Sequence, residues 1–359
     1  MKTPLKKYYL LHVGVGNVGS AVVRQIRQRR KFIKASYGVD LVYCGLFTAE
    51  ADIFKAQGLS NSQLDSFPAA EVKADIPRCL KLIPQPFILI DTTASEHMLP
   101  LLKQALKRGG SVVLSNKKPI SGSQAQFDKL RSLGGQRLFY ETTVGAGLPV
   151  IQTLKMLLAS GDEVIALRGC FSGTLGFIFW QLEDGRPFSG AVLQAKKLGF
   201  TEPDPRDDLS GIDVARKVLI LARLLGRKLE LADVRLQRLY PKSMDKLSSD
   251  DFLKQLRQLD TPYQAKMKAA QKSGKVLRFV ASIDKGGCRV GLEAVPKISE
   301  IGSLQGPDNI IVFKTRRYLK NPLVIKGPGA GVEVTAGGVF SDVLQATLST
   351  KSVAKGKQP

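Results

Sequence analysis

Residues 8–20 read YYLLHVGVGNVGS and decide the fold of the first part of the chain. An apolar strand at 8–13 runs into the pattern G-x-G-x-x-G, and a helix is expected at 20–30. The first glycine of such a turn permits the tight bend, the second lets a pyrophosphate approach the backbone, and the third lets helix and strand pack closely. The helix N-terminus adds amide donors and a partial positive charge. This order predicts a Rossmann-like dinucleotide-binding domain with cofactor contacts from Gly14, Gly16, Asn17, Val18 and Gly19.

Further short apolar segments predict the other strands of a doubly wound sheet, at 40–47, 87–90, 111–114 and 137–140. Ligands of such sheets bind at the carboxyl ends of the strands, and polar side chains follow two of these segments. These cofactor candidates are Thr92, Thr93, Ser115 and Lys117. A solvated loop lysine is the competing interpretation of Lys117.

The choice between NAD and NADP stays open. The segment 40–47 is followed by Thr48, Ala49 and Glu50, and no Asp stands at its end, where an acid would favour NAD. Basic surroundings favour NADP.

Residues 141–149, ETTVGAGLP, follow the last of these segments. Two glycines and a proline predict a folded-back turn whose main-chain carbonyls are suited to a cation. A plain hinge between two domains explains the composition equally well.

The second part of the chain, from Asp162, has the strand and helix patterns of an α+β domain. Strands are expected at 164–171, 275–284 and 287–294, and helices at 174–182 and 189–198. A second glycine-rich turn, GPGAG at 327–331, precedes a helical pattern at 333–344. We therefore expect the chain to return to the first domain there and to offer Gly331 to the cofactor. The predicted division is 1–148 for dinucleotide binding, 149–322 for the second domain, 323–348 for the return, and 349–359 for a basic, disordered tail.

The stretch 198–223, LGFTEPDPRDDLSGIDVARKVLILAR, places an acidic, proline-stiffened loop before a helix that Gly226 is expected to stop. Ser210 and Asp213 are spaced as a capping box. Asp213 and Lys217 are four residues apart, so they share one face of the helix and form a favourable pair. A surface helix with an acidic loop before it is the competing interpretation, because structural ion pairs are common.

Composition excludes several classes of function. The chain has 359 residues, enough for two or three domains, and a net charge of +23. The basic residues are dispersed and no aromatic stripe interleaves with them, so we expect steering of an anionic cofactor and substrate rather than specific nucleic-acid binding. With two histidines, of which His12 is expected to be structural, histidine zinc sites and Ser–His–Asp catalysis are nearly excluded. The four cysteines are isolated and no apolar run is long enough for a membrane span, which predicts a cytoplasmic protein with reduced thiols and no membrane partner.

Several motifs together resemble one known family, homoserine dehydrogenase, and most closely the dehydrogenase half of bifunctional aspartokinase–homoserine dehydrogenases. They are GVGNVGS, SNKKP, YETTVGAGLPVI, SGTLGFIF, the stretch 198–223 and GAGVEVTAGGVFSD. The similarity runs from about Tyr8 to Leu348. We expect no aspartokinase part and no regulatory domain, which puts the family's feedback control in doubt. The segment CFSGTLGFIF departs from many relatives at Phe171 and at Gly176–Phe177.

This resemblance implies reversible reduction of aspartate 4-semialdehyde to homoserine by hydride from NADP or NAD, within threonine, methionine and isoleucine biosynthesis. By motif, Lys217 is the proton donor and acceptor, Lys117 assists at the substrate oxygen, and Asp213 orients Lys217. The resemblance further implies a homodimer built on the second domain. The implied substrate residues are Glu202, Asp208 and Thr174, and the implied sodium ligands are the backbone oxygens of Glu141, Val144, Ala146 and Leu148.

Two other functions stay open. A related dehydrogenase for another small amino-acid aldehyde would use the same acidic loop to hold an ammonium group. An inactive binding protein with a Rossmann shell is the other. Five intact residues argue against it: Lys117, Glu202, Asp208, Asp213 and Lys217.

Overall fold

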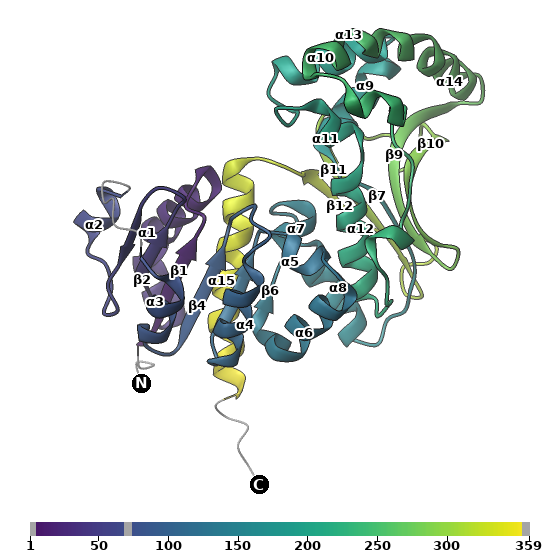
Figure 1. Cartoon of the computed structure of the whole chain (residues 1–359). Helices are drawn as coiled ribbons and strands as arrows, with labels where there is room; N and C mark the ends of the chain where they lie inside the picture. Colours follow the sequence, from purple (N-terminus) through teal and green to yellow (C-terminus); the bar gives the residue numbers. More distant parts are fainter. Residues whose placement is uncertain (1–4, 68–73, 354–359) are drawn as a thin grey trace. The chain divides into compact units, whose positions relative to one another are not determined.

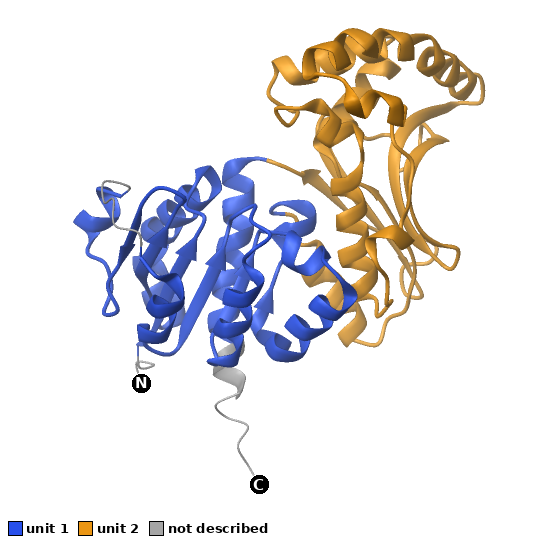
Figure 2. Ribbon diagram, viewed as in Figure 1, with its two compact units in different colours: residues 1–147, 331–359 blue, residues 148–330 orange. Residues whose placement is uncertain are grey.

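The computed structural model describes residues 5–67 and 74–353, with side chains up to residue 348. The chain forms two compact units (Figure 2). Unit 1 consists of residues 1–147 and 331–359, and unit 2 consists of residues 148–330.

Unit 1 contains a six-stranded sheet in the order β3-β2-β1-β4-β5-β6 (Figure 1). Its neighbouring strands are parallel, except that β3 runs antiparallel to β2. From β1 the chain builds one side of the sheet and then crosses over to build the other, which is the doubly wound arrangement that the sequence predicts. The strands are β1 (Lys6–Val13), β2 (Val39–Phe47), β3 (Asp52–Phe54), β4 (Phe87–Asp91), β5 (Ser111–Leu114) and β6 (Leu138–Phe139).

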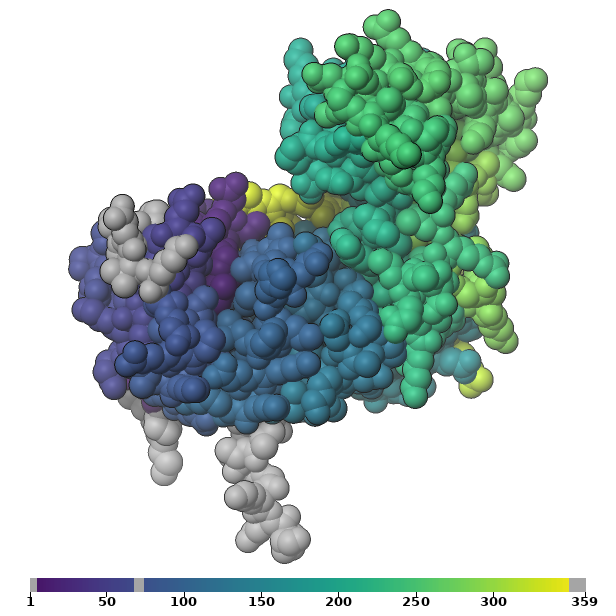
Figure 3. All heavy atoms as spheres, in the orientation of Figure 1, coloured from purple at the N-terminus to yellow at the C-terminus, as the bar shows by residue number. Residues whose placement is uncertain are grey.

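The helices of unit 1 cover the sheet, and α1 and α15 share one hydrophobic core with the strands. Val22 and Ile26 of α1 and Val339 and Val343 of α15 are fully or almost fully buried in it. In the space-filling view, residues of unit 1 coloured blue lie in front of most of α15 (Figure 3). The helices are α1 (Asn17–Tyr37), α2 (Asn61–Asp65), α3 (Ile76–Leu82), α4 (Leu99–Lys107), α5 (Lys118–Ser121), α6 (Gln124–Gly134), α7 (Thr142–Gly145) and α15 (Val332–Val353), with a 3₁₀ turn η1 (Gly135–Arg137).

Unit 2 contains a second six-stranded sheet, in the order β12-β11-β7-β9-β10-β8. Its neighbours are antiparallel except β8 and β10, so the predicted α+β character of this part is confirmed. The strands are β7 (Val164–Cys170), β8 (Arg235–Leu236), β9 (Lys275–Asp284), β10 (Gly287–Pro296), β11 (Asp308–Thr315) and β12 (Leu323–Pro328). The helices are α8 (Val150–Ala159), α9 (Gly173–Glu183), α10 (Phe188–Lys197), α11 (Pro205–Leu209), α12 (Ile212–Leu224), α13 (Ser249–Gln255) and α14 (Asp260–Lys272), with 3₁₀ turns η2 (Leu231–Asp233), η3 (Lys242–Lys246) and η4 (Leu256–Leu259).

Several predicted boundaries were wrong. The first helix continues beyond 30 to Tyr37, because the basic segment still favours helix and Gly38, at φ 62°, provides the C-cap. The return to unit 1 begins at Gly331 rather than at 323, because β12 pairs with β11 and stays in unit 2. Residues 349–353 of the predicted disordered tail continue helix α15, and residues 354–359 lie outside the described part of the chain.

Within residues 5–67 and 74–353, no helix combines the length and the apolar composition that a membrane crossing needs.

Candidate active site

The glycine turn of unit 1 connects β1 to α1 and has the geometry that a dinucleotide site needs. Gly14 has φ 91°, and a Cβ added there would lie 2.6 Å from the Thr93 nitrogen. A Cβ on Gly19 would lie 2.6 Å from the Gly14 carbonyl oxygen, so both glycines are required for packing. Gly16 differs, because a Cβ there would meet nothing within 4 Å. The open side of Gly16 is where a pyrophosphate can approach the backbone at the N-terminus of the 21-residue helix α1.

Thr92 joins this turn to the end of β4. Its hydroxyl donates to the Gly14 carbonyl oxygen at 2.7 Å and lies 2.9 Å from His12 Nε2. Since the hydroxyl proton is used by Gly14, His12 Nε2 carries the proton of that second hydrogen bond. Burial lowers the pKa of His12 to about 3, so the ring is neutral. His12 is therefore a structural residue, as predicted, with one ring nitrogen satisfied by Thr92.

The ends of β4 and β5 place the other cofactor candidates at the same edge of the sheet. Thr93 follows β4, while Ser115 and Lys117 follow β5, which is parallel to β4. Lys117 is half-buried and stands immediately before the short helix α5. The hydroxyl of Thr48, at the end of β2, holds its own turn by donating to the Ala51 carbonyl oxygen at 2.8 Å. Thr48 therefore adds nothing to the choice between NAD and NADP.

Residues 141–147 end the first segment of unit 1, and most of them form one helical turn, α7. Ala146 has φ 52°, a left-handed conformation that alanine rarely adopts, so the peptide there is turned away from the helical direction. The Glu141 carbonyl oxygen accepts from the Val144 nitrogen at 3.4 Å, and the Leu148 carbonyl oxygen, the first in unit 2, accepts from the Val150 nitrogen at 2.8 Å. Main-chain carbonyl oxygens are neutral ligands of the kind that a hard monovalent cation takes, and the sodium site at these residues stays a prediction. Within the described residues, no group of three or more His, Cys, Asp or Glu side chains could hold a metal ion.

In unit 2, Lys217 is buried in the middle of α12, and its amine is held from two sides. Nζ donates to the Phe171 carbonyl oxygen at 2.7 Å and lies 2.9 Å from Asp213 Oδ2. The ion pair expected from the four-residue spacing is present, with the Lys217 side chain 11 % exposed and that of Asp213 43 % exposed. A buried amine with two fixed acceptors has a defined orientation.

The predicted capping box between Ser210 and Asp213 is wrong. Gly211, at φ 72°, is the N-cap of α12, and no side chain caps this helix. Ser210 instead ends α11, with its hydroxyl donating to the Asp207 carbonyl oxygen at 2.9 Å. The left-handed glycine moves the helix start by one residue, so Asp213 stands too early in α12 for a capping box.

The acidic loop brings Glu202, Asp208 and Thr174 together. An oxygen of Asp208 accepts from the Glu202 backbone nitrogen at 2.8 Å. The Thr174 hydroxyl has two acceptors for its proton, the Phe200 carbonyl oxygen at 2.5 Å and the Asp208 carboxylate. Burial, reinforced by the charges of Glu202 and Asp213, raises the pKa of Asp208 to about 6. Such a carboxylate is ready for a cationic group, since a positive charge beside it would favour the ionised form.

The segment 171–174 was not identified as a connector from the sequence. Phe171 contributes the carbonyl that anchors Lys217, Ser172 caps α9 through the Leu175 nitrogen at 3.2 Å, and Thr174 contacts the acidic loop. Four consecutive residues thus link the buried amine to the acidic loop. The only sequence signal was the motif SGT directly after a strand.

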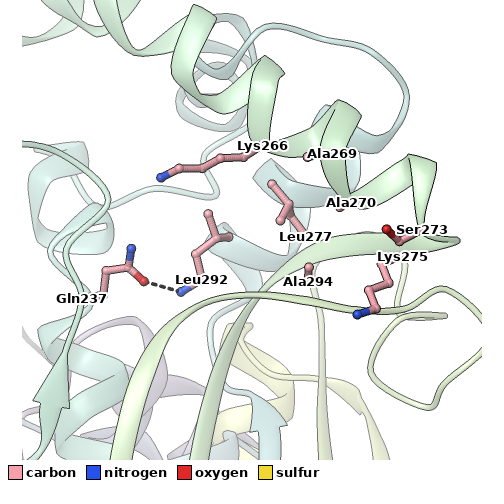
Figure 4. Close-up of a pocket in the computed structure, with 9 residues that line it drawn as sticks. All are labelled: Gln237, Lys266, Ala269, Ala270, Ser273, Lys275, Leu277, Leu292 and Ala294. Carbon is pink, nitrogen blue, oxygen red and sulfur yellow. Dashed lines mark hydrogen bonds between the residues drawn. The ribbon is translucent and has the colours of Figure 1, made fainter.

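A hollow in unit 2 lies apart from these residues. It has a volume of about 430 Å³ and is bordered by α14, β9 and β10 (Figure 4). Gln237 at its rim is held by a hydrogen bond from the Leu292 nitrogen, and Lys266 and Lys275 are exposed. None of its lining residues is a predicted site residue. The candidates are thus divided: the glycine turn, Thr92, Thr93, Ser115, Lys117 and Gly331 belong to unit 1, and Thr174, Glu202, Asp208, Asp213 and Lys217 belong to unit 2.

Comparison with known families gives a match for each of the two parts of the chain. The family model described as homoserine dehydrogenase matches residues 149–344, and that described as homoserine dehydrogenase, NAD binding domain, matches residues 14–141. The chain belongs to the homoserine dehydrogenase family. The resemblance noted from the sequence motifs is thereby confirmed.

Individual relatives agree with this assignment. The homoserine dehydrogenase of Emericella nidulans is 38 % identical over 94 % of this chain and 97 % of its own length. The bifunctional aspartokinase/homoserine dehydrogenase 2 of Zea mays, a chloroplastic protein, is 39 % identical over 93 % of this chain, but this chain spans only 38 % of it.

Solved structures have the same fold. A Candida auris protein of unknown function has a TM-score of 0.88 at 32 % identity, covering 96 % of this chain and 99 % of its own. A hyperthermophilic archaeal homoserine dehydrogenase in complex with NADPH has a TM-score of 0.73 at 25 % identity, covering 96 % and 98 %.

Proposed function

We propose that this chain catalyses the reversible, NAD(P)-dependent conversion of aspartate 4-semialdehyde to homoserine, a step in threonine, methionine and isoleucine biosynthesis. The observation that carries the proposal is the buried amine of Lys217, held by Phe171 and Asp213 within a chain of the homoserine dehydrogenase family.

The chemistry needs a proton donor at the carbonyl oxygen of the aldehyde. The nicotinamide, when bound, supplies a hydride to the carbonyl carbon, so the oxygen gains negative charge and must take up a proton. Lys217 donates that proton in the direction of reduction and accepts it in the direction of oxidation. Asp213 orients the amine, and Lys117, from unit 1, stabilises the oxygen as charge develops.

The acidic loop would hold the amino group of the substrate. Glu202 and Asp208 offer carboxylates to an ammonium ion, and the raised pKa of Asp208 favours a site that becomes fully ionised when the cation arrives. Thr174 adds a hydroxyl beside Asp208. A substrate without an ammonium group would leave these carboxylates to repel each other.

The cofactor would bind at the glycine turn and at the ends of β4 and β5. The open side of Gly16 and the long helix α1 suit a pyrophosphate. Gly331 directly precedes α15, whose N-terminus is a second helix start for the cofactor. The proposed cofactor is NADP or NAD. The NADPH complex of the archaeal relative supports the phosphorylated form.

The proposal also includes a sodium ion, a homodimer and a cytoplasmic location. Sodium would be held by the backbone oxygens of Glu141, Val144, Ala146 and Leu148, a set of neutral oxygens that suits a hard cation. The protein would act as a homodimer through its second sheet domain. It would work in the cytoplasm, since all four cysteines are free and buried thiols, as in a reducing compartment.

The test is a steady-state assay of the purified chain with aspartate 4-semialdehyde and either NADPH or NADH, and with homoserine and either oxidised cofactor. We expect turnover in both directions. A folded chain that binds the nucleotide but turns over neither substrate would contradict the proposal and leave a binding protein. Turnover with other small amino-acid aldehydes, but not with aspartate 4-semialdehyde, would leave the related-dehydrogenase alternative.

A further inference from the structure

Asp91, the last residue of β4, is a completely buried carboxylate that the proposed chemistry does not use. Burial raises its pKa to about 6, although three hydrogen bonds favour its charged form. A buried carboxylate destabilises a fold unless its oxygens are satisfied. The hydrogen-bond partners of Asp91 at this edge of the sheet show how its charge is satisfied.

One oxygen of Asp91 shapes the loop that follows β4. Oδ1 accepts from the Thr93 backbone nitrogen at 2.9 Å and from the Thr93 hydroxyl at 2.7 Å. The Thr93 hydroxyl in turn accepts from the Ser95 nitrogen at 3.1 Å. This half of the network fixes residues 92–95, which carry Thr92 and its hydrogen bond to the glycine turn.

The other oxygen reaches the loop that follows β5. Oδ2 accepts from Asn116 Nδ2 at 3.2 Å, and the same amide lies 2.8 Å from the Ser95 carbonyl oxygen. Asn116 Oδ1 accepts from the Lys118 backbone nitrogen at 3.1 Å. Asn116 is 3 % exposed and directly precedes Lys117. The carboxylate therefore ties together the two loops that carry Thr92, Thr93, Ser115 and Lys117.

An acid is required at this position by the arrangement of donors. Three donors from two loops converge on Asp91, and only an ionised carboxylate accepts on both oxygens without offering a proton. An asparagine in its place would keep the acceptor for Thr93 but would direct its NH₂ group at the NH₂ group of Asn116. The contact between the loops would then become repulsive.

We propose that Asp91 is a positioning residue that, through Asn116, sets the placement of Lys117 relative to Thr92 and Thr93. The kinetic part of this inference rests on the proposed function, whereas the part concerning nucleotide affinity does not. Asp91 touches neither substrate nor cofactor in this role. It acts by holding the cofactor edge in the shape that the reaction needs, where a misplacement of about 1 Å is enough to cost on the order of 100-fold in rate.

The decisive experiment compares Asp91→Asn with the reciprocal double variant Asp91→Asn/Asn116→Asp. The single variant should lose about 10–100-fold in kcat and weaken NADPH binding about tenfold, as expected for one broken buried hydrogen bond. The double variant places an amide on β4 and a carboxylate on the β5 loop, so the contact between positions 91 and 116 is restored with its direction reversed, while the hydrogen bond from position 116 to the Ser95 carbonyl oxygen is lost. We expect it to recover part of the lost activation free energy, measured by steady-state kinetics, and part of the NADPH affinity, measured by fluorescence titration.

The matched control is Asp40→Asn. Asp40 is also a buried carboxylate of unit 1, 4 % exposed, but it lies near the start of β2 and pairs with Arg30 at 2.7 Å and Lys34 at 2.8 Å. The same chemical change there should lower Tm and leave kcat, KM and NADPH affinity unchanged.

The inference is overturned if Asp91→Asn behaves like Asp40→Asn, with a lower Tm and wild-type kinetics and affinity. It is equally overturned if Asn116→Ala, which removes the partner of Asp91 on the β5 loop, has wild-type kinetics and NADPH affinity. Should Asp91→Asn fail to fold, Asn116→Ala tests the same link, because it keeps the bonds from Asp91 to Thr93, and wild-type kinetics in that variant would refute the role. If the wild-type chain shows no turnover, the proposed function fails, and the NADPH titrations still decide the role of Asp91.

Discussion

The amine of Lys217 lies 2.7 Å from the carbonyl oxygen of Phe171, a residue 46 positions earlier in the chain. Together with Asp213, this carbonyl fixes the direction of a side chain that is otherwise among the most flexible in proteins. A proton donor gains from such fixation, because the amine need not be ordered again when the substrate arrives.

Replacing Lys217 with alanine should lower kcat by about 10²–10⁴-fold, the usual worth of general acid–base catalysis. Asp213→Asn should give a smaller loss, since the Phe171 carbonyl still holds the amine. NADPH affinity should be unchanged in both, because the two residues belong to unit 2 and the glycine turn to unit 1. Steady-state kinetics and fluorescence titration check this, and a Lys217→Ala variant with near-normal kcat would remove the residue from the mechanism.

The pH dependence of homoserine binding should report Asp208. Its pKa is raised to about 6 by burial, so it is protonated below pH 6 and ionised above it. An ammonium group binds the ionised form, and kcat/KM for homoserine should therefore fall as the pH drops through 6. Asp208→Asn should raise KM and flatten this part of the profile. An unchanged profile in the variant would assign the titration to another group.

The same shift predicts a change in stability. A carboxyl group whose pKa is higher in the folded protein than in the unfolded one binds more protons when folded, so its contribution becomes less favourable as the pH rises towards and through 6. Asp208→Asn should therefore raise Tm at pH 8 relative to the wild type and have a smaller effect at pH 5. Thermal unfolding of both proteins at the two pH values measures it, and a Tm loss at pH 8 would show that the carboxylate stabilises the empty site.

Alanine substitutions at Gly14 and Gly16 should change different properties of the protein, the first its Tm and the second its NADPH affinity. Gly14→Ala places a Cβ 2.6 Å from the Thr93 nitrogen at φ 91°, so Tm should fall markedly. Gly16→Ala meets nothing within 4 Å in the protein, so Tm should hold while NADPH affinity falls by tenfold or more. Normal NADPH binding by Gly16→Ala would place the pyrophosphate elsewhere.

Removal of monovalent cations should reduce activity if the carbonyls of residues 141–148 hold sodium. We expect kcat in carefully desalted, tetramethylammonium-buffered protein to rise on addition of sodium chloride and not on addition of tetramethylammonium chloride. Gly147→Ala should weaken this response, since a Cβ there would lie 2.4 Å from the Val334 carbonyl oxygen and distort the turn. Equal activity in both salts would end the proposal of a functional cation.

Local patterns predicted most of the elements, and long-range contacts account for what was missed. The strands Ser111–Leu114 and Lys275–Asp284 were predicted to the residue, because apolar runs with clear ends determine them. The Asp213–Lys217 pair followed from spacing alone. The role of the Phe171 carbonyl was not predictable, since any residue supplies a carbonyl. The link from Asp91 to Asn116 joins residues 25 positions apart through a sheet register that sequence patterns do not specify. The capping box failed because a left-handed Gly211 shifted the start of a helix.

The division of unit 1 into two sequence segments has a consequence for the order of assembly during synthesis. Its core needs Ala336, Val339, Val343 and Ala346 of α15, while unit 2 occupies residues 148–330 without interruption. During synthesis, all residues of unit 2 are made before α15. The nucleotide-binding core of unit 1 still lacks this helix at the time when unit 2 is complete. Domains generally fold as units, the N-terminal domain first. In this chain the order is reversed, because unit 1 is the first to begin synthesis and the last to have its core complete.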